Sequence, residues 1–382
     1  MRNPIILFTA LFALISCGNK NGIQFIPVQQ SEGRMFLDAP EVERIYIMLD
    51  DSRIEATVVD IKKVMADDGK LFISHNSSSG QEYNPREVIS VFDMNGNYLN
   101  NISRIGRARN EYVNLDAWCL DTRRKEVVIV DAFRTIKRFK YDGTFVSSVT
   151  VDQASVWGIQ SCNGKLYAHM LMPNNVADDI AEIQDDGTLI PLLPSRNIKD
   201  ETLSSGGGGI GTCPHFSDPD LNSFFHLRIF DNTIYRIEGS DYETCGLFDF
   251  IKPADENLDD IIHADELLLS RPHFTAETED CFIIKTYEIS DDRMISAYLY
   301  YLYDKSKKEC TLYRLDSSTA NTIANRFDIV GVTGNTIISK ATPDGARFIL
   351  DQAADKIPQS DLEMMEQLAE RQNSSLILHK LK

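Results

Sequence analysis

The hydrophobic residues of this chain fall in short runs that are separated by polar turns. Between Ile61 and Gly143 the same unit occurs twice: two apolar strands joined by a tight polar turn, then a loop and a third strand that ends in an Asp- and Gly-containing turn. Asp and Gly tolerate the backbone angles that a reversal needs, whereas β-branched and aromatic runs suit half-buried strands. The pattern therefore predicts antiparallel β-structure over this stretch.

The strand-turn-strand unit continues toward the C-terminus. Turn centres lie near residues 69, 124, 164, 232, 292 and 335. Their mean spacing is about 53 residues, close to the 40 to 50 of a four-stranded propeller blade once long loops are allowed for. One small sheet cannot bury both of its faces alone, and radial stacking covers them while leaving only short edges. We predict an all-β fold, a six-bladed β-propeller of four-stranded antiparallel blades.

Helical periodicity is confined to the region near the C-terminus. Ser360 and Glu363 have the spacing of a capping box. One apolar stripe follows, at Leu362, Met365, Leu368 and Ala369. We predict one short helix here, with Asn373 as its stop. After it, residues 376–382 alternate like a final strand, and we expect the early run 24–28 to pair beside that strand or share its blade, which would close the ring.

The first seventeen residues are predicted to be a lipoprotein signal peptide. Arg2 gives a short positive start, residues 5–15 form an apolar stretch too short to span a bilayer comfortably, and Leu-Ile-Ser-Cys at 14–17 has the form of a bacterial lipobox. Cys17 is then the lipid attachment site. The alternative is a simple secretory peptide with an incidental cysteine.

The remaining residues are expected to form a tether and one domain. We assign residues 18–33 to the tether and 34–382 to a single six-bladed propeller, which we expect to be a monomer. Because no acidic run follows Cys17, we expect the lipid to anchor the protein in the outer membrane, facing the periplasm.

Composition and charge exclude some partners. The chain has 382 residues, 43% of them hydrophobic, and a formal net charge of −18, which argues against binding to nucleic acid or to an anionic membrane surface. The six cysteines beyond Cys17 are widely scattered and form no CxxC or Cys/His motif for zinc. We interpret them as mostly buried free thiols, with disulfides as the alternative.

Four features of the chain point to one group of proteins. They are the lipobox, VFDMNGNYLNNI (91–102) with IGRARNEY (105–112), FDNTIYRI (230–237) with LFDF after it, and the C-terminal helix followed by LILHKLK. In these the chain resembles the six-bladed β-propeller lipoproteins of Bacteroides-type bacteria, whose blades are similar to NHL repeats. The resemblance covers essentially all of the mature chain, and it implies architecture more than chemistry.

Members of that family usually carry a G-x-G-x-G-E-[FY] loop after the first complete blade. Gly106, Glu111 and Tyr112 match this motif, whereas Ala108 and Asn110 replace glycines. Asn can adopt a left-handed conformation, so Asn110 is expected to preserve the turn.

Two sets of residues are candidates for ligand binding. Three arginines within six residues, Arg104, Arg107 and Arg109, could hold a carboxylate or sulfate; the alternative is a solvated loop paired with local acids. Trp118 and Trp157 open the inner strands of successive predicted blades. They could stack on a sugar or peptide face, helped by nearby Tyr112; the alternative is packing between blades.

Metal-binding candidates are weaker. His215, Asp218 and Asp220 in the segment HFSDPD supply suitable donors for a divalent ion, but a polar loop bent by proline explains the same residues. The other histidines that a propeller could gather on its axis are His169, His226, His263 and His273. The GGGGIG run at 206–211 lacks the Lys-Ser/Thr of a phosphate loop and is interpreted as a flexible loop.

These observations favour a binding protein over an enzyme. Since no GxSxG, HExxH or paired-carboxylate motif is present, our first hypothesis is a lipid-anchored, exported, non-catalytic propeller without a cofactor. It would bind a peptide, glycan or protein partner. The alternative is a metal-assisted propeller lyase or hydrolase acting on a glycan or peptide, and a third hypothesis is a periplasmic sensor or assembly factor.

Overall fold

The structure is a computed structural model. The ranges that it describes are 25–31, 42–76, 87–102, 105–151, 155–170, 178–194, 215–227, 233–248, 273–289, 295–316, 328–354 and 358–381. Several predictions concern residues outside these ranges. They are the signal peptide with Cys17, Arg104, the glycine run 206–211 and His263.

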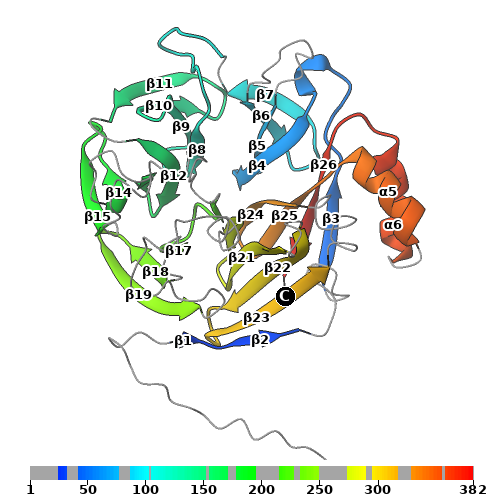
Figure 1. The fold of residues 1–382 in the computed structure, drawn as a ribbon. Coiled ribbons are helices and arrows are strands. Elements are labelled where there is room, and N and C mark those ends of the chain that lie inside the picture. Colours follow the sequence, from blue (N-terminus) through cyan, green and yellow to red (C-terminus); the bar gives the residue numbers. More distant parts are fainter. Residues whose placement is uncertain are drawn as a thin grey trace, which may run out of the picture.

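Strands dominate the described part of the chain, and they form five hydrogen-bonded sheets arranged around a common centre (Figure 1). Two of these sheets have four strands that are consecutive in the chain. The first contains β8 (Ala117–Asp121), β9 (Glu126–Asp131), β10 (Thr135–Lys140) and β11 (Phe145–Thr150). The second contains β12 (Val156–Cys162), β13 (Lys165–Met170), β14 (Asp178–Ile183) and β15 (Leu189–Pro194). Every neighbouring pair in both sheets is antiparallel.

The largest sheet has eight strands, in the order β3-β26-β25-β24-β4-β5-β6-β7. One half consists of β4 (Val59–Asp67), β5 (Lys70–Asn76), β6 (Glu87–Asp93) and β7 (Tyr98–Ile102). The other half consists of β24 (Ile329–Thr333), β25 (Thr336–Ala341), β26 (Ser375–Lys380) and β3 (Glu43–Ile47). The halves meet in one parallel pair, β24 with β4, whose register is Gly331 opposite Val64. A short 3-10 turn, η2 (Ile54–Ala56), lies between β3 and β4.

The remaining two sheets each combine a group of antiparallel strands with a strand from near the N-terminus. The first contains β17 (Phe224–Leu227), β18 (Thr233–Glu238), β19 (Asp241–Phe248) and β1 (Phe25–Ile26). The second contains β16 (His215–Ser217), β20 (Phe274–Glu277), β21 (Cys281–Ile289), β22 (Ile295–Asp304), β23 (Glu309–Asp316) and β2 (Val28–Gln30). Both β1 and β2 pair in parallel, with β19 and β23 respectively.

The predicted hairpin turns are found where the structure describes them. Asp68 and Gly69 have φ values of 53° and 68°, and Asn163 and Gly164 have 50° and 73°. These are the positive angles that two-residue hairpin turns need, and Asn, Asp and Gly adopt them at low cost. The turns predicted near residues 232 and 292 lie outside the described residues, although the strands on either side pair antiparallel.

Burial follows the apolar runs. All six residues of β9 are buried, and the largest hydrophobic cluster combines side chains from β4 to β14. Among the described cysteines, Cys119, Cys162, Cys281 and Cys310 are buried and Cys245 is partly buried, and all five are free thiols. This confirms the interpretation of mostly buried free thiols for the described cysteines.

The helical prediction needs correction, because two helices are present rather than one. They are α5 (Pro343–Ala353) and α6 (Gln359–Ala369), which pack on β26 outside the ring of sheets through Ala346, Met365, Leu368 and Ile377 (Figure 1). The backbone N–H of Gly345 donates a 3.0 Å hydrogen bond to the Thr342 hydroxyl, which caps α5. In the described ranges no helix has the length and apolar character to cross a membrane.

The predicted capping box and helix stop are also wrong. The N-cap of α6 is Pro358 rather than Ser360, and no side chain caps it; the C-cap is Glu370. Asn373 is instead buried and joins two segments of the chain by side-chain hydrogen bonds. Its side chain accepts a hydrogen bond from the Val58 amide and donates to the carbonyl oxygens of Asp50 and Ala56.

Closure of the ring also differs from the prediction. The final strand β26 pairs antiparallel with β3, not with the early run 24–28. Residues 25–30 of the predicted tether instead form β1 and β2, which lie on the outer strands of two other sheets (Figure 1). Pro27 between them has no amide hydrogen, which suits a position where the chain passes from one sheet edge to the next.

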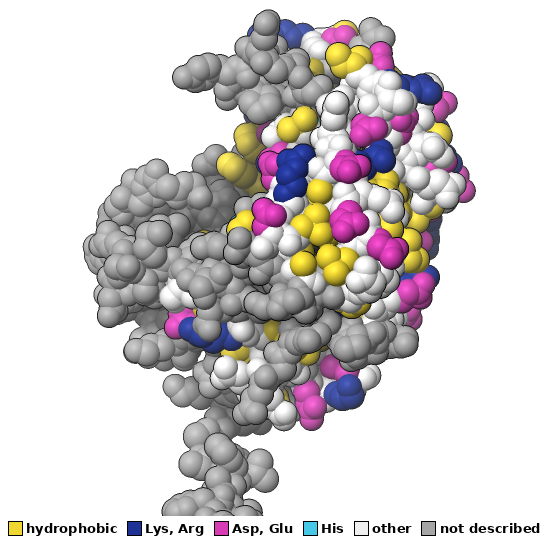
Figure 2. All heavy atoms as spheres, turned by 90° about the vertical axis from the view of Figure 1, so that its right-hand side faces the viewer, with side chains coloured by type: hydrophobic (Ala, Val, Ile, Leu, Met, Phe, Trp, Pro, Cys, Tyr) yellow, Lys and Arg dark blue, Asp and Glu magenta, His cyan; other side chains and the backbone are white. Residues whose placement is uncertain are grey.

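Acidic side chains do not gather on the face that carries the helices. Figure 2 shows basic and acidic groups interspersed with small hydrophobic ones over its described part. The exposed large hydrophobic residues are likewise scattered over many strands and turns.

Candidate functional site

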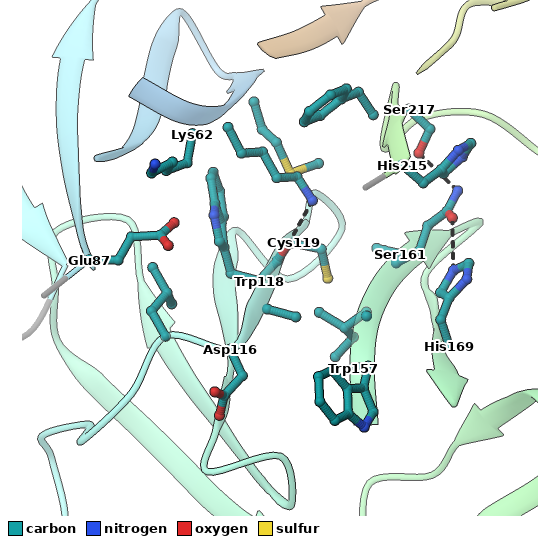
Figure 3. A pocket seen from close by; sticks show the side chains of 18 of the residues that line it. Lys62, Glu87, Asp116, Trp118, Cys119, Trp157, Ser161, His169, His215 and Ser217 are labelled. Carbon is teal, nitrogen blue, oxygen red and sulfur yellow. Dashed lines mark hydrogen bonds between the residues drawn. The ribbon is translucent and has the colours of Figure 1, made fainter. Parts of the chain in front are cut away.

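A cavity of about 510 Å³ lies where the inner strands β4, β8, β12 and β16 approach one another. Its polar and aromatic lining includes Lys63, Glu87, Asp116, Trp118, Phe133, Trp157, Gln160, His169, His215 and Ser217. Figure 3 shows Glu87 and Trp118 on one side of this space and His169 and His215 on the other. Its volume is in the range of small-molecule sites.

Both tryptophans of the sequence line this cavity. Trp118 in β8 is only 3% exposed, and its indole Nε1 has no hydrogen-bond partner in the described part of the chain. Trp157 lies at a bulge in β12, where the register shifts between Val156 and Gly158. A bulge re-aims side chains, and the ring of Trp157 stacks on Phe133 with centroids 4.4 Å apart and an interplanar angle of 29°.

Lys63 brings a positive charge to the same cavity. Its ammonium donates a 2.8 Å hydrogen bond to the Trp118 carbonyl oxygen and lies 5.3 Å from the centroid of the Trp118 ring. Register shifts on both sides of Ile61 interrupt the alternation of β4 before this residue. Burial lowers the pKa of the Lys63 ammonium because it disfavours the charged form.

Two carboxyl groups, of Glu87 and Asp116, lie on the same side of the cavity as Trp118 (Figure 3). Burial raises the pKa of Glu87, and burial likewise raises that of Asp116. Asp116 accepts a 2.8 Å hydrogen bond from the Phe133 amide, so it also fixes the turn that supports Trp157.

Hydrogen-bonded neutral polar groups line the opposite side of the cavity, where His169 and His215 lie (Figure 3). Gln160 donates a 2.8 Å hydrogen bond to the Ser217 hydroxyl, and its carbonyl oxygen lies 3.3 Å from Nε2 of His169. Burial lowers the pKa of His169 to about 4, and burial together with neighbouring positive groups lowers that of His215 well below its ordinary value. Both histidines are therefore neutral near pH 7.

His215 also has an unused hydrogen-bonding group. Its Nδ1 lies 2.7 Å from the Thr275 hydroxyl, whereas the buried Nε2 has no hydrogen-bond partner among the residues that the structure describes. The nearest carboxylate oxygen, of Glu277, is 3.7 Å from Nε2. This distance is too long for a hydrogen bond, and a neutral imidazole forms no ion pair.

The histidines come together only in part. The ring centroid of His169 lies 6.4 Å from that of His215 and 5.6 Å from that of His226, whereas His273 contacts Phe274 and Tyr287. Within the described ranges, no group of three or more His, Cys, Asp or Glu side chains is placed to hold a metal ion.

The structure separates His215 from the two aspartates of its segment. Asp218 and Asp220 line a different cavity, of about 990 Å³. Asp218 accepts hydrogen bonds from the amides of Asp220 and Gly334, and Asp220 accepts one from the Thr122 hydroxyl. These contacts fix loops.

The loop that carries Arg107 and Arg109 does not line the cavity of Trp118 and Trp157, which we call the tryptophan cavity. Arg107 and Arg109 are exposed, and Arg109 lies over the Phe145 ring. Glu111 accepts a 2.9 Å hydrogen bond from the Ala108 amide, and Tyr112 is 1% exposed with its hydroxyl on the Glu87 carbonyl oxygen. Asn110 is not among the residues with positive φ, so the expected left-handed conformation is wrong.

Sequence reasoning missed six of the polar and aromatic lining residues: Lys63, Glu87, Asp116, Phe133, Gln160 and Ser217. The only available signal was the pair of adjacent lysines, Lys62 and Lys63, in an otherwise apolar run. Glu87, Gln160 and Ser217 are ordinary polar residues of strands, and only the meeting of strands from different sheets places them together.

The fold and the cavity define the class: a ring of mainly antiparallel sheets, a β-propeller, with a polar and aromatic cavity among its inner strands. A family profile matches residues 46–380, and the chain belongs to this family, described as Domain of unknown function (DUF4934). No curated protein matches the chain.

Solved structures show the same fold. A protein of Bacteroides fragilis described as exported matches with a TM-score of 0.68 and 14% identity, over 94% of this chain and 100% of that chain. A DUF4221 family member from Bacteroides vulgatus matches with a TM-score of 0.52 and 8% identity, over 90% and 98% of the two chains.

Proposed function

We propose that this protein is an exported, lipid-anchored, six-bladed β-propeller that binds a small glycan or peptide in the tryptophan cavity without transforming it. The observation that carries the proposal is the placement of both tryptophans of the chain around one cavity, together with a buried indole N–H that has no partner among the described residues.

The sheet topology supports a count of six blades. The eight-stranded sheet divides at the single pair of Gly331 and Val64 into two groups of four strands. With two sheets of consecutive strands and two groups completed by β1 and β2, this gives six units, five of four strands and one of six. The β16 segment precedes β17 in the chain but pairs with β20, and thereby links two of these units.

Export and anchoring are supported by the lipobox at residues 14–17 and by the description of the Bacteroides fragilis relative as exported. Replacing Cys17 with Ser removes the thiol that lipid would modify. We expect the C17S protein to appear in the soluble fraction of the cells that produce it, whereas the unchanged chain stays with the membranes. Retention of the variant in membranes would contradict the lipid anchor.

The chemistry of the cavity supports binding. Aromatic faces contact the apolar faces of sugar rings or of peptide side chains. A buried indole N–H without a partner carries a free-energy cost of about 1–3 kcal/mol, which an acceptor on a ligand would relieve. The described residues offer no group of three metal-ligating side chains, so no observation favours metal-assisted catalysis.

Intrinsic tryptophan fluorescence tests the proposal directly, since both emitting residues line the cavity. The probes would be glucose, galactose, their uronic acids, N-acetylglucosamine and alanyl-alanine, each added to the soluble chain that starts after Cys17. We expect a saturable change in emission with at least one probe, and weaker binding of it by W157F. A matched control is Y242F, which alters an exposed aromatic residue of β19. A panel without any saturable change would overturn the proposal.

A further inference from the structure

Among the residues that the structure describes, the lysines placed away from solvent have carboxylate partners, with one exception. Lys285, 1% exposed at its side chain, lies 2.6 Å from Asp328. Lys137 lies 2.9 Å from Asp131, and Lys305 lies 2.7 Å from Glu277, which is itself fully buried. Since removing an ammonium from water is costly, a carboxylate at hydrogen-bonding distance is the usual compensation.

Lys63 is the exception. It is partly buried and lines the tryptophan cavity, yet in the part of the chain that the structure describes no carboxylate lies within ion-pair distance. Its one hydrogen bond is the contact with the Trp118 carbonyl oxygen. An ammonium has three donors, so two remain for a group that enters the cavity.

We propose that Lys63 is the anchor for the carboxylate of an acidic sugar, a uronic acid, whose ring lies against Trp157. This inference rests on the proposed function and names the ligand class of the same cavity. Glu87 acts on the Lys63 charge only from beyond ion-pair distance, so the ligand carboxylate supplies the direct partner. A charge-assisted hydrogen bond of this kind is stronger than one between neutral groups.

The remaining lining fits a sugar ring. Nε1 of Trp118 can only donate a hydrogen bond, and His215 contributes a second buried ring nitrogen without a partner. Hydroxyl groups accept and donate, so a polyhydroxylated ring satisfies both atoms whichever tautomer His215 adopts. The face of a sugar ring that carries C–H groups matches the flat surface of an indole. The volume of about 510 Å³ accommodates a small saccharide rather than a long chain.

The carboxyl groups of the cavity restrict where the carboxylate of a ligand can bind. Glu87 and Asp116 belong to the same side as Trp118 (Figure 3), and they repel a second carboxylate wherever they are ionised. The hydrogen bond from Lys63 to the Trp118 carbonyl oxygen fixes the position of the ammonium on this side of the cavity. Lys62 also lines the cavity, but its ammonium is already paired with Asp60. A ligand carboxylate therefore gains its favourable contact at Lys63, and only the neutral part of the ring fits against the acids.

The experiment compares acids with their neutral parents. Glucuronic acid is paired with glucose, and galacturonic acid with galactose; binding is measured by tryptophan fluorescence and by calorimetry. We expect at least one acid to bind tenfold or more tightly than its parent sugar. Lys63→Met keeps the aliphatic stem but removes the charge, and should abolish this difference. Lys63→Arg keeps the charge and should retain most of it, which separates lost recognition from a folding defect.

The control is Lys70→Met, a lysine of the β4–β5 hairpin that pairs with Asp68 outside the cavity. It should leave the preference for the acid unchanged. Equal binding of acid and parent sugar, or a preference that survives in Lys63→Met, would overturn the role of Lys63 while leaving the cavity as a binding site. Binding of alanyl-alanine or N-acetylglucosamine alone would overturn the acidic-sugar class, and a complete lack of response would overturn the proposed function itself.

Discussion

Individual histidines in this protein are held neutral by burial. His379 in β26 is 5% exposed, and within the described ranges neither of its ring nitrogens has a hydrogen-bond partner. Burial, with a smaller effect of Arg44, lowers its pKa to about 3, and burial lowers that of His169 to about 4. A charged imidazole at either position would lack both water and a counter-ion.

These lowered pKa values predict weaker folding in mild acid. The unfolded chain takes up the His379 proton near pH 6.5, whereas the folded chain does so only near pH 3, so the contribution of His379 to stability is complete above pH 6.5 and is lost as the pH falls. Between pH 7 and 5 this amounts to about 2 kcal/mol. We expect His379→Phe to lose about 2 kcal/mol less free energy of unfolding than the parent over this interval, measured by urea denaturation. Equal losses in the two proteins would contradict the prediction.

At the scale of elements, glycine decides how closely two strands approach. Gly331 in β24 lies opposite Val64 in β4, and a Cβ at Gly331 would collide with the Val64 carbonyl oxygen. This backbone group cannot move aside without disturbing the pair that joins the two halves of the eight-stranded sheet.

Gly331→Ala therefore tests the junction. We expect it to lower the free energy of unfolding by about 1–3 kcal/mol, as overpacking does in well-packed interiors. The comparison is Gly334→Ala in the following turn, where a Cβ meets nothing within 4 Å but φ is +52°, so only backbone strain of about 1 kcal/mol or less is expected. Chemical denaturation of both variants measures the difference. A cost at Gly331 no larger than at Gly334 would show that the junction tolerates a side chain.

Local sequence patterns predict the hairpins of this protein correctly but not the start of its helices. The strand pairs around the turns at residues 68–69 and 163–164 follow from local chemistry, since Asp, Asn and Gly accept the positive φ angles there. Helix α5 is not predicted from the sequence, although Thr342 and Pro343 are good starting residues, because only one residue separates it from the end of strand β25. The false capping box at Ser360 had the right spacing, but Pro358 begins the helix two residues earlier.

At the scale of the whole molecule, the two ends of the described domain are joined in one sheet. The last strand, β26, lies between β25 and β3, with residues such as Ile377 opposite both Ser339 and Tyr46. The Asn373 side chain ties the turn before β26 to the segment that leads from β3 to β4. Strands β1 and β2 cover the outer edges of two further sheets.

Removing residues 376–382 should therefore open the ring. The truncation deletes five residues of β26, so the paired residues of β3 and β25 lose their partners. It also removes the buried side chains of Leu376, Ile377 and Leu378 from the core. Each such side chain contributes about 1.5–3 kcal/mol, so we expect a melting temperature at least 10 °C lower, or no cooperative transition. The control is a chain that starts at residue 32 and lacks only β1 and β2, which should fall less. An unchanged melting temperature of the C-terminal truncation would contradict closure by β26.

The sequence by itself determined the all-β class, the hairpins and the buried thiols, because turn chemistry and alternating hydrophobicity are local properties. It also placed Trp118 and Trp157 at the starts of inner strands, where both line the cavity. Only the tertiary structure decided which strand closes the ring, because several alternating strands could pair equally well on local grounds. It likewise brought Lys63, Gln160 and His215 around one space, since convergence of residues from different sheets depends on the arrangement of those sheets and on bulges that no local pattern predicts.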